Sequence, residues 1–508
     1  MKKPIKIVLA ALGVNTLVSL WVINPLINSS HSAILHWQGR PSELFLNTLI
    51  IFCLPWIIFI ALFTIAERPG RPRVVIWFAT VLLLPWIVIK NIAIITGRFP
   101  SFPIRAFSLL APVAATFLLT IVWKPSYRAR FERALKLATT LLIFLGISGL
   151  LALAELAWFA HKARDLNTPA PLHAHSGTNS KPRIVWIIFD ELSYQQLFVS
   201  RPPSLDLPAF DRFASESTNY TQVVPAGPLT EVVVPSLLTG QPVEAINAAS
   251  DGRSITLHHP NGSRSTLDPH DTIFQDALNA GYSTAVVGWF IPYCRVLPAV
   301  LDHCTWTFNG LTPNGFIPNT WVTNNIADSL LYVAGSGPVS RVAAHLPFTK
   351  PVGDIDLAPH ISDYETLLAA TLTTLKDPTA DFVLIHLPVP HPGGIYDRRT
   401  RTFATRHTSY ADNLALADQA LAQIRATLEA SGQWDSTTIL IMGDHSWRTP
   451  RWQPSTFWTA EDERNHPPVF DPRPAYLLKR PNQHTAQSID TPVNAADTRT
   501  LLRSLLIH

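Results

Sequence analysis

The chain has 508 residues, of which 47% are hydrophobic and 15% are charged, and its formal net charge is +4. This length exceeds that of one compact domain, so we expect at least two structural units. Residues 1–160 contain 15 Lys or Arg and 4 Asp or Glu, whereas residues 161–508 contain 25 and 32. The basic excess lies between apolar runs rather than on a polar surface, which argues against a nucleic-acid-binding protein and favours a membrane protein.

Residues 1–160 are predicted to form a membrane domain. The apolar runs long enough to cross a bilayer lie at about 7–27, 44–66, 74–96, 106–123 and 137–160. The loops on one side carry 11 Lys or Arg and those on the other side carry 3, so the positive-inside rule places the N-terminus in the cytoplasm. Five crossings then put the chain after residue 160 on the outer side of the membrane.

The cysteines are consistent with this topology. Cys53 lies in the second apolar run, and Cys294 and Cys304 follow the membrane domain. A pair of cysteines in an oxidising compartment most simply forms a disulfide, and two thiols alone are too few for a metal site.

The rest of the chain is predicted to be a polar linker, residues 161–182, followed by a folded domain, residues 183–508. The first element of that domain is the continuous apolar run Ile184 to Phe189, which predicts a strand buried on both faces. Helical segments such as LPAFDRFASES and TIFQDALNAG then alternate with buried runs such as YSTAVVGWF, DFVLIHL and TILIMGD. This alternation is typical of an α/β sandwich with a mostly parallel central sheet.

Two segments of this domain lack the alternating pattern. Residues 241–270 are predicted to be an inserted hairpin that turns at Asn261 and Gly262. Residues 305–365 are predicted to be an irregular, aromatic-rich insertion.

Polar side chains follow the predicted strands at the points where the strands end. Asp190 and Glu191 follow the first strand, Asp444 and His445 follow the last, and Thr230 begins a helix in GPLTEVVVPSLLTG. Ligands of open α/β sheets bind at this edge, so we expect these residues to converge. Carboxylate and imidazole ligands together favour Zn²⁺, with Mn²⁺, Mg²⁺ and Ca²⁺ as alternatives. A divalent ion beside Thr230 would make its hydroxyl a nucleophile able to form a covalent phospho-threonine.

Each of these motifs also has a purely structural interpretation. An acidic pair after a strand can cap a helix, and a threonine at a helix start is by default an N-cap. His386, which precedes the loop after its strand, could be a buried structural histidine. Asp418, on a long predicted helix, is expected to cap or pair rather than bind a metal.

Taken together, these motifs resemble the alkaline phosphatase and sulfatase superfamily over residues of about 183–480. The similar segments are IIFDEL, LPAFDRFASES, LNAGYSTAVVGWF, the PHP at 390–392 and ILIMGDHSWR. The resemblance implies a metal site formed by Asp190, Glu191, Thr230, Asp444 and His445, with Thr230 as the nucleophile. It further implies that His391 and His466 bind the substrate.

Thr230 cannot be oxidised to the formylglycine of true sulfatases, and the residues after it lack the proline and arginine that this group requires. Predicted membrane helices ahead of a threonine nucleophile resemble instead the phosphoethanolamine transferases of bacterial envelopes and, more distantly, the lipoteichoic acid synthases. This resemblance implies an enzyme of the bacterial inner membrane, with its catalytic domain on the periplasmic or extracellular side. Its donor would be a membrane phospholipid and its acceptor an envelope lipid or glycan. The alternatives are a membrane-anchored sulfatase-like or phosphodiesterase hydrolase, and a non-catalytic sensor or scaffold with a degenerate site.

Overall fold

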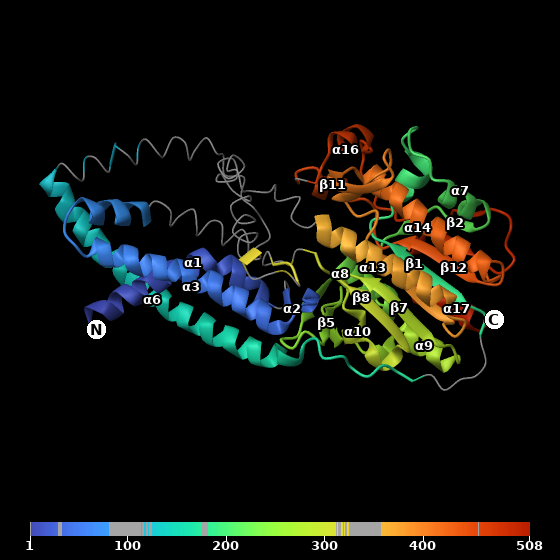
Figure 1. The fold of residues 1–508 in the computed structure, drawn as a ribbon, viewed down its shortest axis with the longest axis horizontal. Helices are drawn as coiled ribbons and strands as arrows, with labels where there is room; N and C mark the ends of the chain where they lie inside the picture. Colours follow the sequence, from blue (N-terminus) through green and yellow to red (C-terminus); the bar gives the residue numbers. More distant parts are fainter. Residues whose placement is uncertain are drawn as a thin grey trace.

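The computed structural model describes residues 2–28, 33–80, 124–174, 181–310, 357–455 and 457–507, with scattered residues in 113–120 and 312–324. Figure 1 shows a bundle of long helices beside a larger domain built on a sheet, which we call the sheet domain (residues 181–507). The boundary between the two parts agrees with the change in composition after residue 160.

The bundle consists mainly of α1 (Lys3–Ile27), α3 (Pro41–Ala66) and α6 (Pro125–Lys162). In the described part of the chain, segments of these three helices are long and apolar enough to cross a membrane. The predicted spans at 74–96 and 106–123 lie largely outside the described residues. Helices α1 and α6 pack very closely, because a Cβ atom on Gly146 would lie 2.2 Å from the carbonyl oxygen of Leu9. Small residues allow such close contact between membrane helices.

The sheet domain is centred on an eight-stranded mixed sheet with the order β14-β2-β13-β12-β1-β9-β7-β8. Strand β1 lies between β12 and β9, and both neighbours are parallel to it. Strand β13 is antiparallel to both β12 and β2. The bounds are β1 Ile184–Phe189, β2 Thr218–Tyr220, β7 Thr284–Trp289, β8 His303–Thr307, β9 Phe382–Leu387, β12 Thr438–Gly443, β13 Tyr476–Lys479 and β14 Gln487–Ile489. The structure thus confirms the predicted α/β architecture with a mostly parallel sheet.

Helices cover both faces of this sheet. Alternate residues of β1, such as Val185 and Ile187, contribute to a core with α7 (Pro208–Ser215), α13 (Leu357–Lys376) and α14 (Tyr410–Ala430). The residues between them, such as Trp186 and Ile188, contribute to a second core with α8 (Thr230–Thr239), α9 (Ile273–Asn279) and α17 (Thr498–Leu506). A strand buried on both faces needs apolar residues at every position, which explains the unbroken run that predicted β1.

The two insertions fold differently from each other. The predicted hairpin is confirmed, since β5 (Ile255–His258) pairs with β6 (Arg264–Thr266) in antiparallel fashion around Gly262, whose φ is +79°. The prediction that residues 305–365 are irregular is wrong at its end, because α13 begins at Leu357. Leu357, Leu367, Leu368 and Leu375 are all buried on one side of this helix. Most of the remainder of that segment lies outside the described residues.

The segment predicted as a linker packs against the folded parts of the chain where it is described. Helix α6 continues to Lys162, and Ala163 and Leu166 are buried in the core of the helical bundle. Further along, the His173 N–H donates to the carbonyl of Leu301 at 2.9 Å, and the Lys181 N–H donates to Asp381 Oδ1 at 3.2 Å. The described part of this segment therefore packs along the sheet domain.

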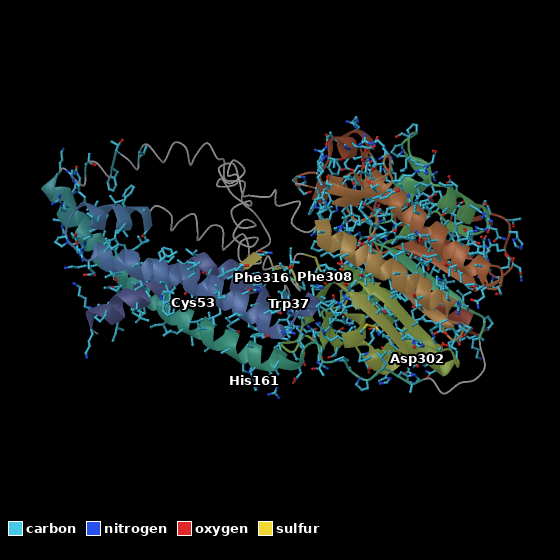
Figure 2. All side chains as sticks on the ribbon, in the orientation of Figure 1. Trp37, Cys53, His161, Asp302, Phe308 and Phe316 are labelled. Atoms are coloured by element: carbon cyan, nitrogen blue, oxygen red, sulfur yellow. A yellow bond between two sulfur atoms is a disulfide. The ribbon has the colours of Figure 1, made fainter. Side chains whose placement is uncertain are left out.

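The loop between α1 and α3 joins the bundle to one edge of the sheet. The side chain of Gln38 accepts a hydrogen bond from the backbone N–H of Phe308, just after β8, at 3.1 Å. Arg295 of α10 (Tyr293–Val296) is buried and donates to the backbone carbonyls of Leu35 at 3.1 Å and Trp37 at 2.8 Å. Figure 2 shows Trp37 and Phe308 where the helices meet the sheet domain. The carboxyl ends of β7 and β8 therefore face the bundle.

Cys294 and Cys304 form a disulfide, as predicted, which joins α10 to β8. Cys53 lies in the helical bundle and is a free thiol (Figure 2).

Candidate active site

The alternation of side chains along three strands brings Asp190, His386 and Asp444 together. In β1, β9 and β12, the residues Ile188, Leu384 and Met442 face the core that contains α8. Side chains of a strand alternate between its two faces, so the residue two positions further along each strand points the same way. These next residues are Asp190, His386 and Asp444, and their ligand atoms lie within 4.8 Å of one another.

Thr230 reaches this cluster from the first turn of α8. Its Oγ1 donates a hydrogen bond to Asp444 Oδ2 at 2.7 Å and lies 3.3 Å from His445 Nε2. The N-cap of α8 is Leu229, so Thr230 is the first helical residue and its side chain does not cap the helix. The structural interpretation of Thr230 as an N-cap is therefore wrong, and the hydroxyl points to the predicted partners instead.

Two features of the backbone allow the loops after β1 and β12 to meet. Glu191 has a φ of +65°, an uncommon conformation for a non-glycine residue, and its N–H donates to Asp444 Oδ1 at 2.9 Å. A Cβ atom on Gly443 would lie 2.5 Å from the carbonyl oxygen of Leu192, so only glycine fits there. Strained conformations of this kind are concentrated at functional sites.

The electrostatics of the cluster favour a bound cation. Burial, followed by the negative charges of Asp444 and Glu191, raises the pKa of Asp190 well above its usual range. Burial also lowers the pKa of His386 to about 4, and burial with the nearby charge of Arg448 lowers that of His445 to about 3. Both imidazoles are therefore neutral at physiological pH, which is the form that binds metals.

Two buried polar atoms at the centre of the cluster have no hydrogen-bond partner among the described residues. These atoms are Asp190 Oδ1 and His386 Nε2. The other ring nitrogen of His386 lies 2.9 Å from the hydroxyl of Tyr293, which fixes the orientation of the imidazole. An unpartnered buried carboxylate oxygen and imidazole nitrogen are costly without a ligand. Asp190, His386, Asp444, Thr230 and His445 thus form a donor set that fits a divalent cation of the zinc type.

Glu191 is buried next to the same cluster, but its carboxylate already has partners. Arg448 Nε donates to Glu191 Oε1 at 2.8 Å, and the Trp452 indole N–H donates to the same oxygen at 2.9 Å. Asp190, Glu191 and His445 also offer ligand atoms within 4.8 Å of one another. As a metal ligand, Glu191 would therefore share its charge with Arg448.

The structure places the two predicted substrate-binding histidines differently. The ring of His391 packs against Trp452, with centroids 5.0 Å apart, and so lies beside the indole that holds Glu191. His466 contacts the carbonyl of Glu463 at 2.9 Å and the ring of Trp458. In the described part of the chain, no contact joins His466 to the cluster. Asp418 accepts a hydrogen bond from the Phe210 N–H in the first turn of α7 at 2.8 Å, in agreement with the prediction that it caps or pairs.

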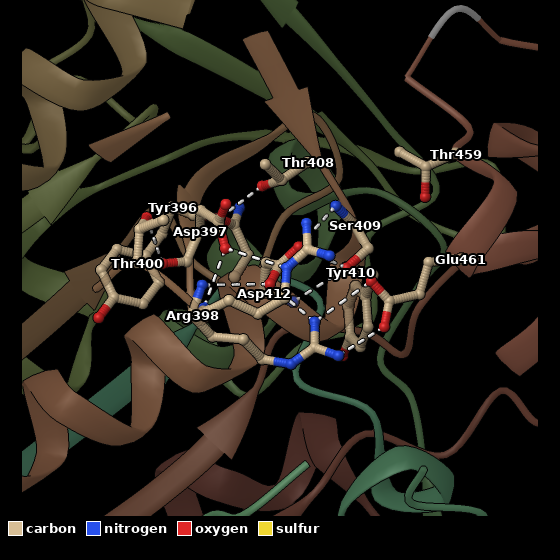
Figure 3. A network of polar contacts seen from close by, with 12 residues as sticks. Tyr396, Asp397, Arg398, Thr400, Thr408, Ser409, Tyr410, Asp412, Thr459 and Glu461 are labelled. Atoms are coloured by element: carbon tan, nitrogen blue, oxygen red, sulfur yellow. Dashed lines mark hydrogen bonds and ion pairs between the residues drawn. The ribbon is translucent and has the colours of Figure 1, made fainter. Parts of the chain in front are cut away.

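A polar network supports the loop that carries Asp190 and Glu191. Arg398 donates to Asp412 at 2.7 Å and to Glu461 at 2.5 Å, and it joins the hairpin of β10 (Gly394–Asp397) and β11 (Thr402–Thr408) to α14 and α16 (Ala460–Asn465) (Figure 3). Tyr410, which begins α14, donates its hydroxyl proton to the carbonyl of Glu191 at 2.7 Å. The network therefore fixes the turn in which Glu191 has its unusual conformation.

A cleft of about 610 Å³ opens beside the cluster, lined by Leu229, which precedes Thr230, and by His445. His445 and Ser446 line this cleft, together with the charged residues Arg448 and Arg451. The other lining residues are apolar or glycine: Pro225, Gly227, Pro228, Leu229, Pro450, Phe470 and Pro472. A cleft with an apolar wall and convergent polar groups is the usual form of a small-molecule site.

Sequence reasoning named His386 but favoured a structural role for it, and it did not name Arg448 or Trp452. His386 is conspicuous in the sequence as the one histidine in the apolar strand DFVLIHL. Whether its side chain points to the site depends on which helices cover each face of the sheet. Arg448 and Trp452 lie shortly after Asp444 and His445 in the sequence. Their pairing with Glu191 depends on a contact across more than 250 residues of sequence.

Comparison with known proteins agrees with this geometry. The sulfatase family model matches residues 182–493, which is more than half of the chain. The chain belongs to the sulfatase family. Members of this superfamily are hydrolases or transferases that act on phosphate or sulfate esters, and they use divalent metals. The match covers all of the cluster and the whole central sheet.

Three of the solved structures to which the chain is similar are the following. A phosphonate monoester hydrolase from Agrobacterium radiobacter is 15% identical, with a TM-score of 0.39 over 64% of this chain and 74% of that one. A lipoteichoic acid synthase from Listeria monocytogenes is 13% identical, with a TM-score of 0.39 over 64% and 72%. An alkaline phosphatase superfamily protein from Vibrio parahaemolyticus is 15% identical, with a TM-score of 0.34 over 67% and 69%. No curated protein matches the chain.

Proposed function

We propose that this sulfatase-family protein is a metal-dependent transferase of the bacterial envelope that moves a phosphoryl-linked head group, of the phosphoethanolamine type, through a covalent phospho-threonine at Thr230. The donor is a membrane phospholipid and the acceptor is an envelope lipid or glycan. The observation that carries the proposal is the position of Thr230 Oγ1, 2.7 Å from Asp444 Oδ2 and 3.3 Å from His445 Nε2, beside a cluster suited to a divalent cation.

The groups around Thr230 provide what the first step requires. A new bond forms between Thr230 Oγ1 and phosphorus while the bond from phosphorus to the donor's glycerol oxygen breaks, and diacylglycerol leaves after taking up a proton. Asp444 Oδ2 already accepts the hydroxyl hydrogen bond, so it is placed to receive the proton of Thr230. In the second step an acceptor hydroxyl attacks phosphorus, and the oxygen of Thr230 leaves and regains a proton.

A divalent cation held by Asp190, His386, Asp444 and His445 would supply Lewis-acid stabilisation of the phosphoryl oxygens and of the ionised threonine. Thr230 lies in the first turn of α8, where the helix dipole favours negative charge. Arg448 and Arg451, which line the cleft, add fixed positive charge. Each of these features stabilises charge that develops during phosphoryl transfer.

The arrangement of the domains supports a lipid donor. The site lies at the carboxyl ends of the parallel strands, and the ends of β7 and β8 at this edge contact the loop between α1 and α3. A phospholipid could therefore present its head group without leaving the bilayer. The Cys294–Cys304 disulfide supports a sheet domain on the oxidising, periplasmic side of the inner membrane.

The test is covalent capture on the full-length protein in lipid nanodiscs that contain head-group-labelled phosphatidylethanolamine. Mass spectrometry of the peptide containing Thr230 should show the head-group phosphate on this residue. Thr230→Ala should abolish the label while metal content, measured by plasma mass spectrometry, stays near that of the wild type. Thr239→Ala is the matched control, because Thr239 lies at the other end of α8 and its hydroxyl bonds only to Pro235 and Gln241 among the described residues. Labelling that persists in Thr230→Ala would contradict the proposal.

The same samples separate transfer from hydrolysis. Release of labelled phosphoethanolamine into water, with no increase in product when lipid or glycan acceptors are added, would identify a hydrolase. Transfer predicts that product appears on an added acceptor and that Thr230→Ala removes it.

A further inference from the structure

The turn between α16 and β13, residues 466–472, lies at the same edge of the sheet as the candidate active site. Strand β13 runs antiparallel to β12, and Tyr476 at its beginning pairs with Met442 near the end of β12. The chain just before β13 is therefore adjacent to Asp444. In Figure 1, α16 lies on the side of the sheet domain that is nearest to the helical bundle. The turn thus lies on the bilayer-facing side if the bundle spans a membrane.

This turn exposes apolar side chains next to the mouth of the cleft. Val469 is 76% exposed and the adjacent Phe470 is 38% exposed. Phe470 and Pro472 line the cleft that leads to His445. Pro467, Pro468 and Pro472 restrict the backbone of the turn, so the two apolar side chains are presented with little loss of conformational entropy. An exposed pair of apolar side chains beside a binding cleft is typical of an interaction site.

The charged residues near the turn are compatible with a lipid surface. Arg451 lines the cleft, and its guanidinium makes no hydrogen bond or ion pair with the described residues, although it lies near the ring of Trp452. Arginine at a bilayer surface is attracted to phosphate groups. Arg448 is already paired with Glu191, so Arg451 is the cation of the cleft that remains available.

The acidic residues beside the turn have partners that reduce their repulsion from lipid phosphates. Asp471 forms an ion pair with Arg473 at 2.6 Å, and Glu461 forms one with Arg398 at 2.5 Å. Asp462 is buried as part of the capping box of α16. Glu463 accepts a hydrogen bond from the Trp458 indole at 2.7 Å. The surface around Val469 therefore presents apolar side chains, and the carboxylates near it are ion-paired, buried or hydrogen-bonded.

We propose that the Val469–Phe470 turn enters the head-group region of the outer leaflet and holds the cleft against the bilayer, so that Arg451 contacts the phosphate of a lipid. This extends the proposed use of a lipid donor by assigning the surface through which the lipid enters. The partner that the turn contacts is the lipid bilayer. The role of the turn does not require that Thr230 be the nucleophile.

The decisive experiment measures the depth of the turn in a membrane. In a Cys53→Ser background with the disulfide intact, Val469→Cys is labelled with an environment-sensitive fluorophore. The protein is then placed in nanodiscs of phosphatidylethanolamine and phosphatidylglycerol with a trace of lipid carrying a doxyl quencher near its ester groups. Ile507→Cys is the matched control, since Ile507 is 80% exposed and lies by α17, at the end of the sheet domain away from the bundle (Figure 1). The Thr230→Ala background allows the same measurement without catalysis.

The label at position 469 should have a blue-shifted emission and be quenched by the lipid-borne doxyl group, whereas the label at 507 should behave as in water. Apolar side chains at an interface are buried to about 5–10 Å, which is within reach of such a quencher. Equal emission and equal quenching at the two positions would overturn the proposal, as would protection of position 469 by a bound protein instead of by lipid.

A second measurement tests the consequence for activity. Val469→Asp should lower the efficiency of transfer from a bilayer donor about fivefold, which is the factor expected for excluding about half of a valine side chain from an apolar phase. Turnover of a water-soluble phosphodiester, bis(p-nitrophenyl) phosphate, should be unchanged. An equal loss on both substrates would show that the turn acts on the cleft and not on the membrane. If neither substrate is turned over by the wild type, the proposed function fails while the fluorescence result still decides the role of the turn.

Discussion

Asp190→Asn should have opposite effects on stability in the metal-free and metal-loaded protein. Without a metal, Asp190 is a fully buried carboxylate whose Oδ1 has no hydrogen-bond partner among the described residues, and Asp444 and Glu191 lie nearby. Replacing it with a neutral amide removes the burial of a charge and its repulsion from two neighbouring carboxylates. We expect the metal-free variant to be more stable than the wild type by about 1–3 kcal/mol.

With a metal, the same substitution removes a ligand. A metal present at about 1,000 times its dissociation constant stabilises the folded state by about 4.1 kcal/mol, and a variant that no longer binds loses that increment, which exceeds its gain of about 1–3 kcal/mol. The assay is chemical unfolding of the detergent-solubilised protein, with chelator or with Zn²⁺, together with metal analysis. A variant that is less stable than the wild type under both conditions would refute the reasoning, because it would show that Asp190 is satisfied without a cation.

The pH dependence of the metal-free protein provides an independent check. The pKa of Asp190 is raised in the folded state, so between the unfolded and folded pKa values the folded protein binds more protons than the unfolded one. Stability should then fall as pH rises from about 4, with a slope of up to about 1.4 kcal/mol per pH unit. Asp190→Asn should remove this part of the slope.

Three further substitutions test other parts of the structure. His386→Gln should lower the amount of metal bound per chain, measured by plasma mass spectrometry. The reason is that His386 Nδ1 contacts the Tyr293 hydroxyl, whereas Nε2 has no partner among the described residues and is placed to bind a metal. An unchanged metal content would exclude His386 as a ligand. Arg448→Met should cost about 3–5 kcal/mol in chemical unfolding, because the fully buried carboxylate of Glu191 would lose its counter-charge, and a cost below about 1 kcal/mol would show that the pair is dispensable. Gly146→Leu should lower the thermal unfolding temperature and cost at least about 1–3 kcal/mol, because its side chain would collide with the backbone of α1. The control Leu151→Ala should have little effect, because Leu151 of α6 is 66% exposed. Equal effects would contradict the close packing of α1 and α6.

The sequence was sufficient to predict the elements whose signals are local. Strand β1 was visible because a strand between two layers of helices is apolar at every position, and the residues after it were visible because carboxylates rarely follow such a run without a reason. Helix α13 was missed although its leucines recur at helical spacing, since it adjoins an aromatic-rich segment without regular pattern. Local patterns therefore located the edge of the sheet at which the site lies.

The sequence could not determine which layer a side chain faces or which distant residues contact it. The histidine of β9 can face either layer, and it belongs to the site only because the even-numbered positions of this strand face α8. Glu191 stays a predicted metal ligand, but the sequence could not show that Arg448 and Trp452 also donate hydrogen bonds to its carboxylate from a distant part of the chain. These outcomes depend on tertiary contacts that no window of sequence contains.

The position of the candidate site at the carboxyl ends of the parallel strands determines the path of the chain after α6. Parallel strands place their carboxyl ends at one edge, and β7 and β8 end beside the loop between α1 and α3. Helix α6 enters the sheet domain from the same bundle, so the chain must first travel to the opposite edge before β1 can run back toward it. Strand β1 has 6 residues and spans about 20 Å, whereas residues 163–182 can extend to about 65 Å. The hydrogen bonds of His173 with Leu301 and of Lys181 with Asp381, which precedes β9, mark this path along the domain. A chain that entered β1 directly from the bundle would place Asp190 at the far edge, so the polar segment is what places the candidate site at the edge of the sheet that faces the helical bundle.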